Sequence, residues 1–318
     1  MSAVLNVQDL RVTYPGAQPA VRGVSFAIAR GEAVGIIGES GSGKSSVLLA
    51  LMRLLGDAAV GGSAHFNGDD LVAASEECLR ALRGDRLTMV FQDPQTSFSP
   101  VFPLSTQFLA ALHRRAESRD AKLRLAVEAL RGVGIAEPER RIRDYPHAFS
   151  GGMLQRAAIA LALMSSPDLL IADEPTTALD ATTEAQIIAL LRDLRQRYSG
   201  AVLIVSHQPN LIAALCDRVM VMYGGVIVEE GPTAQVLKDP RHPYTRRLLA
   251  CEPAHIETVT RHLPTIPGRP PDLSLLQAGC AFAERCLQKV DGCTIVEPQL
   301  LPVAEARRAR CYALQSLA

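Results

Sequence analysis

The chain of 318 residues contains no tryptophan, and aromatic residues make up only 4% of it. It also lacks an excess of either charge, because 33 lysine and arginine residues balance 33 aspartate and glutamate residues. A balanced chain has no overall field that would attract nucleic acid or anionic lipid. The longest apolar run, near residues 157–164, falls well short of the roughly 20 residues that a membrane-spanning helix needs. These absences argue against a nucleic-acid-binding protein and against an integral membrane protein.

A secretory signal is also missing from the N-terminus. The first residues, MSAVLNVQDLRVTYPG, contain no basic stretch followed by an apolar one. We therefore expect a cytosolic protein, whose thiols stay reduced. Disulfide bonds would then be a poor explanation for the cysteines of this chain.

What the sequence does contain is an alternation of short apolar runs with helical patterns. The first 30 residues predict two strands joined by a turn at Pro15-Gly16. Further strands are predicted within residues 33–37, 85–93, 168–175 and 201–207, and helices within residues 44–55, 105–135 and 150–167. Continuous apolar strands that alternate with helices are typical of an α/β fold with a parallel sheet.

A phosphate-binding loop is predicted between the strand at 33–37 and the helix after it. The stretch GESGSGKS fits the pattern G-x-x-x-x-G-K-[ST], whose glycines let backbone amides surround nucleotide phosphates. Lys44 would neutralise the β- and γ-phosphates, and the hydroxyl of Ser45 would bind Mg²⁺. The residues expected to contact the nucleotide are Gly38, Ser40, Gly41, Ser42, Gly43, Lys44, Ser45 and Ser46.

Two adjacent acids end the apolar stretch LLIADE, residues 169–174. Burying such acids is costly unless a cation or a reaction uses them. We expect Asp173 to hold Mg²⁺ and Glu174 to polarise the water that attacks the γ-phosphate.

The motif FSGGMLQR, residues 149–156, together with the phosphate loop and LLIADEPTTALD, resembles the ATP-binding cassette (ABC) ATPases over residues 1–235. The stretches FQDP, YPHAFSGGM, HPYT and IPG resemble one branch, the ATPase subunits of bacterial peptide/nickel importers. The resemblance implies a P-loop NTPase core of the ABC type within residues 1–237, with an inserted helical subdomain at about 95–165. Residues 238–318, rich in proline and then in cysteine, would form a small irregular extension.

The resemblance also assigns roles to residues. Tyr14 would stack on adenine, Gln92 would contact Mg²⁺ and the attacking water, and His207 would hold the γ-phosphate. Ser150, Gly151 and Gly152 would bind the γ-phosphate held by a partner cassette. Asp180 would connect the two ATP sites of the paired cassettes. The alternatives are a core aromatic for Tyr14 and a structural histidine for His207.

A single cassette implies partners. In this family the loop that corresponds to Ser150, Gly151 and Gly152, called the signature loop, cannot reach the phosphate loop of its own cassette. The resemblance implies a second, non-identical ATPase subunit, two transmembrane permease subunits and an extracytoplasmic substrate-binding protein. The chain would then lie on the cytoplasmic face of the bacterial inner membrane, and the cargo would be an oligopeptide, a dipeptide or a related small solute. The alternative is a soluble ABC ATPase acting on nucleic acid, the ribosome or a cluster-assembly complex; the charge balance disfavours nucleic acid.

Four of the seven cysteines, Cys280, Cys286, Cys293 and Cys311, lie in the last 39 residues. Their spacing lacks the close pairs usual in zinc and iron–sulfur sites, so spacing alone leaves a cluster, zinc and simple burial open. The resemblance to the importer branch implies a [4Fe–4S] cluster. Cys78, Cys216 and Cys251 are interpreted as packing residues.

Overall fold

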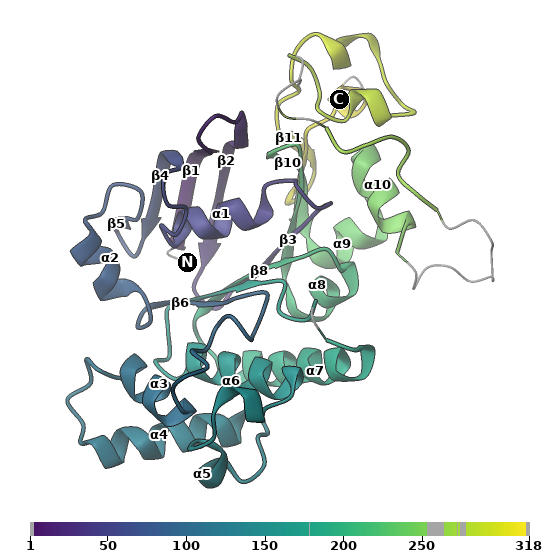
Figure 1. Ribbon diagram of the computed structural model, residues 1–318. Helices are drawn as coiled ribbons and strands as arrows, with labels where there is room; N and C mark the ends of the chain where they lie inside the picture. Colours follow the sequence, from purple (N-terminus) through teal and green to yellow (C-terminus); the bar gives the residue numbers. More distant parts are fainter. Residues whose placement is uncertain (1–2, 178, 253–263, 272, 274–277, 316–318) are drawn as a thin grey trace. The chain divides into compact units, whose positions relative to one another are not determined.

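The computed structural model describes residues 3–177, 179–252, 264–271, 273 and 278–315 (Figure 1). The chain divides into two compact units. One, the phosphate-loop unit, comprises residues 3–29, 33–74 and 204–318, and the other, the helical unit, comprises residues 30–32 and 75–203. Strand β8 (Ala201–Ser206) contains the division between them, and all six of its residues are buried.

The phosphate-loop unit contains an antiparallel sheet in the order β2-β1-β4-β5. Strands β1 (Ala3–Thr13) and β2 (Pro19–Ala29) form the hairpin predicted from the first 30 residues. Strand β4 (Ala59–Phe66) pairs with β1 on the other side, and the short β5 (Asp69–Asp70) follows it. Alternate residues of β1 and β2 are buried, which is the pattern of strands with one face on a core.

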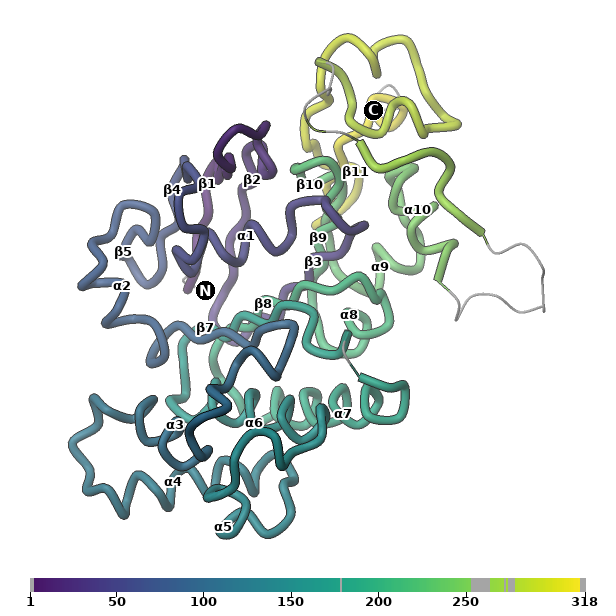
Figure 2. Tube along the Cα trace, viewed as in Figure 1, coloured from purple at the N-terminus to yellow at the C-terminus, as the bar shows by residue number. Residues whose placement is uncertain are grey.

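Its other strands run in the order β11-β12-β10-β9-β3. The fully buried β3 (Ala33–Ile37) is parallel to β9 (Arg218–Tyr223), and β10 (Val226–Pro232) turns back antiparallel to β9. After residues 280–293, the cysteine segment, the chain returns to form β11 (Leu301–Ala304) and β12 (Arg307–Ala309). Strand β12 pairs with β10, and β11 pairs with β12 (Figure 2). The C-terminal extension therefore supplies two strands to the sheet that contains β3.

The helices of this unit differ from expectation in two places. Helix α1 (Lys44–Leu51) ends earlier than the predicted residue 55, because Arg53 adopts a positive φ of 50° and Leu54 is 44% exposed. Helix α10 (Pro243–Ala250) forms in a stretch expected to be irregular. Pro243 is its first residue, where the missing N–H of proline costs no hydrogen bond.

The remaining elements of this unit are short. They are α8 (Pro209–Leu215), α9 (Thr233–Lys238), α11 (Tyr312–Gln315) and the 3₁₀ helices η4 (Ala283–Arg285) and η5 (Asp291–Thr294). Part of the proline-rich stretch of the predicted extension, residues 253–263, lies outside the described residues.

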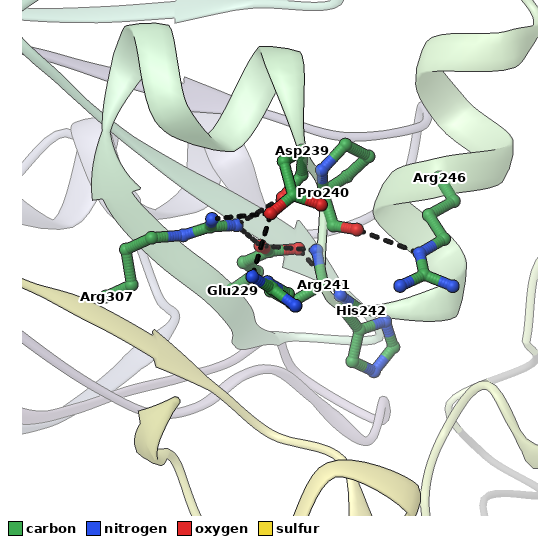
Figure 3. Close-up of polar contacts among 7 residues, drawn as sticks. All are labelled: Glu229, Asp239, Pro240, Arg241, His242, Arg246 and Arg307. Carbon is green, nitrogen blue, oxygen red and sulfur yellow. Dashed lines mark hydrogen bonds and ion pairs between the residues drawn. The ribbon is translucent and has the colours of Figure 1, made fainter. Parts of the chain in front are cut away.

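A buried carboxylate fastens the extension to β10 (Figure 3). Glu229, which has no exposed surface, accepts hydrogen bonds from the backbone N–H groups of Arg241 and His242, each at 2.8 Å. The guanidinium of Arg307 on β12 contacts the same carboxylate at 2.9 Å and is 4% exposed. Every one of these partners is a hydrogen-bond donor, so the side chain of Glu229 joins β10 to the start of α10 and to β12.

The helical unit is built around two parallel strands, β6 (Leu87–Val90) and β7 (Leu169–Asp173). Its helices are α2 (Glu76–Leu82), α3 (Leu104–Ala111), α4 (Arg119–Gly132), α5 (Pro138–Arg141), the 3₁₀ helix η1 (Pro146–Ala148), α6 (Gly151–Leu163) and α7 (Ala181–Arg197). The helical region predicted within 105–135 is therefore two helices, α3 and α4. Among the described residues, no helix is both long enough and apolar enough to span a membrane.

Candidate active site

The predicted phosphate loop is a tight turn between β3 and α1. Gly43, which precedes α1, has a φ of 99°, and a Cβ there would lie 2.5 Å from the carbonyl oxygen of Ala20. The Nζ of Lys44 donates hydrogen bonds to the carbonyls of Gly38 at 2.8 Å and Glu39 at 2.9 Å. These bonds hold the ammonium across the loop, and α1 begins directly at Lys44, so that its N-terminus, the end of a helix that suits an anion, lies at the loop.

Tyr14 lies beside the same helix. Its hydroxyl and that of Ser46, in the first turn of α1, are 3.0 Å apart. His207 follows β8 and is exposed, and the next backbone N–H, of Gln208, donates to the hydroxyl of Ser206 at 2.9 Å. The phosphate loop, Tyr14 and His207 thus all belong to the phosphate-loop unit.

The two acids occupy different environments at the end of β7 in the helical unit. Asp173 is the last strand residue and is buried, while Glu174 is half-buried with a positive φ of 44°. The Nε2 of Gln92 donates to the Oε2 of Glu174 at 3.1 Å, and the Thr177 hydroxyl donates to the same oxygen at 2.8 Å. The structure therefore brings together Gln92 and Glu174, which the sequence singled out separately.

The signature motif forms the N-terminus of α6. The hydroxyl of Ser150 accepts a hydrogen bond from the N–H of Met153 at 3.3 Å, as an N-cap does. A Cβ at Gly152 would lie 2.4 Å from the Cγ2 of Thr183 on α7, so only glycine fits there. Gly151 is exposed beside it. The loop is thus packed against the beginning of α7.

Asp180 is the N-cap of α7. One oxygen accepts from the N–H groups of Thr182 and Thr183 at 3.1 Å, and the other accepts from the Thr183 hydroxyl at 2.6 Å. The hydrogen bond from the Thr183 side chain, with those from the backbone, lowers the pKa of Asp180. Asp180 is therefore a carboxylate near neutral pH.

Two threonines of this site were not predicted. Thr177 contacts Glu174, and Thr183 contacts both Asp180 and Gly152. A partial signal for Thr183 was present in the sequence, because Asp180 before a helical stretch is a favoured N-cap, and an N-cap side chain bonds to residues in the first turn. Thr177 had no comparable signal, because its role depends on the turn after β7.

None of the seven cysteines, all of which are described, forms a disulfide. The N–H of Cys280 donates to the carbonyl of Cys293 at 2.7 Å. Burial, together with the charges of the other three C-terminal cysteines, raises the pKa of Cys280 to about 11, so the four thiols share one region. Within the described part of the chain, no three Cys, His, Asp or Glu side chains are arranged to hold a metal ion.

Comparison with known proteins identifies the family to which this chain belongs. A family model described as "ABC transporter" matches residues 21–177, and one described as "Oligopeptide/dipeptide transporter, C-terminal region" matches residues 228–293. The solved dimeric cassette MJ0796 in a post-hydrolysis state, bound to ADP and Pi, has a TM-score of 0.64 and 28% identity, covering 72% of this chain and 98% of that one. The chain therefore belongs to the ABC transporter family and is an ATPase of the P-loop class.

The branch within that family follows from the relatives. A probable peptide ABC transporter ATP-binding protein of Sinorhizobium fredii, y4tR, is 44% identical over 97% of this chain and 94% of its own length. The oligopeptide transport ATP-binding protein OppD of Bacillus subtilis is 41% identical over 99% of this chain and 90% of its own length. The chain therefore belongs to the same branch of the family as these peptide-transporter ATP-binding proteins.

Proposed function

We propose that this chain is the ATP-hydrolysing subunit of a bacterial importer for oligopeptides or dipeptides, attached to the cytoplasmic face of the inner membrane. The match of residues 228–293 to the oligopeptide/dipeptide C-terminal region supports this choice over a soluble ABC ATPase, because most of that region lies beyond the 1–237 cassette. The names of the relatives support the same cargo class.

The single observation that carries the proposed chemistry is the contact between Gln92 and Glu174 at 3.1 Å. Glu174 acts as the general base that orients and polarises the attacking water, and Gln92 fixes the position of the carboxylate. Lys44 neutralises the phosphates, His207 holds the γ-phosphate, and Tyr14 stacks on adenine.

A magnesium ion suits the side chains expected to bind it, because a hydroxyl, an amide oxygen and a carboxylate are the oxygen ligands that it prefers. Ser45, Gln92 and Asp173 would hold it. When bound, it neutralises charge that develops on the β- and γ-phosphates.

The signature residues serve a partner cassette. Ser150, Gly151 and Gly152 present the N-terminus of α6, a site suited to an anion, to the γ-phosphate held by the opposing subunit. We propose a non-identical ATPase subunit as that partner, with Asp180 connecting the two sites. Two permease subunits would dock near Gln92 and the 95–165 helical region, and an extracytoplasmic binding protein would deliver the cargo.

The test uses the assembled transporter in proteoliposomes, with ATP hydrolysis measured at saturating ATP and peptide-loaded binding protein. Glu174→Gln should abolish turnover and trap ATP in a closed pair of cassettes, because the amide cannot accept the proton of the attacking water. Asp193→Asn, on α7, is the control and should retain activity. Normal turnover by Glu174→Gln would refute the assigned base, and stimulation by RNA rather than by the binding protein would refute the importer.

We further propose that residues 238–318 act as an extension of the 1–237 cassette and that its four C-terminal cysteines hold a [4Fe–4S] cluster. The shared region of Cys280, Cys286, Cys293 and Cys311 supports this, since a set of four thiolates suits iron–sulfur chemistry. To hold the cluster, the four side chains would have to move closer together than they are in the described structure. Anaerobic purification followed by iron and zinc analysis tests it. Broad visible absorbance with iron is the expected result, and stoichiometric zinc without iron would refute it.

A further inference from the structure

An arginine of the cysteine segment contacts the phosphate loop. The Nη1 and Nη2 atoms of Arg285, in η4, lie 2.7 and 3.1 Å from the two carboxylate oxygens of Glu39, the second residue of the loop. Arg285 is 6% exposed and Glu39 is 22% exposed, so the pair is largely shielded from water. Both residues belong to the phosphate-loop unit.

All five N–H donors of this guanidinium have acceptors. Besides Glu39, Nη1 donates to the hydroxyl of Tyr223 at 3.1 Å, Nε donates to the carbonyl of Pro267 at 2.7 Å, and Nη2 donates to the carbonyl of Ile266 at 3.2 Å. An arginine has five donors in a fixed plane, whereas a lysine has three on one atom. The surroundings are thus fitted to arginine, and Arg285 joins the extension, β9 and the loop at one point.

The extension reaches the loop by a second route. The N–H of Glu39 donates to the hydroxyl of Tyr244, on α10, at 2.8 Å. The rings of Tyr223, Tyr244 and Phe282 pack against one another with centroids 4.4 to 5.4 Å apart. Phe282 lies just before η4, so the aromatic cluster and the ion pair hold both the side chain and the backbone of Glu39.

Because Glu39 is charged, these contacts are expected to affect the binding of ATP. A carboxylate in the loop that binds a triphosphate repels it unless a cation compensates, and Lys44 already donates to two carbonyls of the loop. We propose that Arg285 is a positioning residue for ATP: it neutralises Glu39 and fixes the loop, so that the C-terminal extension sets the affinity of the cassette for nucleotide.

The test measures binding of a fluorescent ATP analogue, and then KM and kcat for ATP in the assembled transporter. Arg285→Met should weaken ATP binding about tenfold, because it leaves an uncompensated carboxylate beside the phosphates. KM should rise by a similar factor with little change in kcat, because the groups that perform hydrolysis are untouched. Arg285→Lys should recover only part of the affinity.

Adding Glu39→Gln to Arg285→Met separates electrostatics from folding. The double variant should regain most of the lost affinity, because no unpaired charge remains, whereas a merely misfolded extension would not be rescued. Glu297→Gln is the matched control: its ion pair with Arg22, at 2.7 Å, ties the same extension to β2, and its loss leaves the Arg285–Glu39 pair in place. Wild-type affinity in Arg285→Met, a double variant as weak as the single one, or an equal loss in Glu297→Gln would each overturn the proposal. If the wild-type chain bound no ATP, the assigned function would fail instead.

Discussion

Gly152 of the signature motif and Thr183 of α7 are in such close contact that a Cβ on the glycine would lie 2.4 Å from the Cγ2 of the threonine. The loop expected to grip the γ-phosphate is therefore positioned by the residue that also donates to Asp180 at 2.6 Å. Thr183 links the two functional elements directly.

Gly152→Ala should reduce ATP hydrolysis by the assembled transporter at least tenfold, because the added methyl group must displace either α6 or α7. Thr183→Ser removes the Cγ2 methyl and keeps the hydroxyl that binds Asp180. The double variant should therefore recover part of the activity in a steady-state ATPase assay, and no recovery would contradict a steric cause.

Arg307→Met should lower the free energy of unfolding by about 3–5 kcal/mol, because it leaves Glu229 charged, buried and without its side-chain partner. Thermal unfolding measured by calorimetry at pH 7.5 would show the loss. Arg11→Met is the comparison: this arginine pairs with Asp9 at 2.9 Å, but both side chains are more than half exposed. Its effect should stay below about 1 kcal/mol, and equal losses in the two variants would contradict the role assigned to burial.

Stability should fall as the pH decreases from about 6.5 towards 3. Burial lowers the pKa of His242 to about 3, whereas an unfolded histidine titrates near 6.5, so in this window the unfolded chain binds a proton that the folded chain does not. The expected slope from this residue is about 1.4 kcal/mol per pH unit.

His242→Asn should remove that contribution while keeping an acceptor for the N–H of Tyr244, which the Nδ1 of His242 binds at 3.0 Å. The check is the difference in thermal midpoint between the variant and the wild type, measured at pH 7.5 and 5.5. A constant difference at the two pH values would show that His242 does not carry the effect.

Tyr14→Ala should weaken ATP binding by about 1–3 kcal/mol, the usual contribution of stacking between an aromatic ring and a base. Tyr14→Phe keeps the ring and loses only the contact with Ser46, so its affinity should fall by less. Titration with a fluorescent ATP analogue measures both, and equal losses in the two variants would argue for a packing role instead of stacking.

Local patterns were sufficient to predict the phosphate loop, the β1–β2 hairpin and the strand that ends at Asp173. Each depends on residues close in sequence: glycines before a helix, alternation around Pro15-Gly16, or an apolar run that ends in two acids. The family resemblance then indicated Gln92 and the signature residues, which composition alone would not have revealed.

The contacts of the extension could not be predicted in the same way. Arg285 lies 246 residues from Glu39, and Arg307 lies 78 residues from Glu229. No sequence periodicity or motif spacing relates such distant positions, because their contacts depend on the order of the strands in the sheet. Pro243 led to the wrong prediction of an irregular stretch where α10 begins. Proline breaks the interior of a helix, but it is favoured at the first position.

The place of β12 beside β10 has a consequence for synthesis on the ribosome. A nascent chain that has not yet reached residue 301 leaves the outer edge of β10 without a partner, and an uncovered edge strand is a template for aggregation. Truncation before β11 should therefore yield insoluble protein instead of a smaller active ATPase, and cells would need to shield this edge until the last strands emerge.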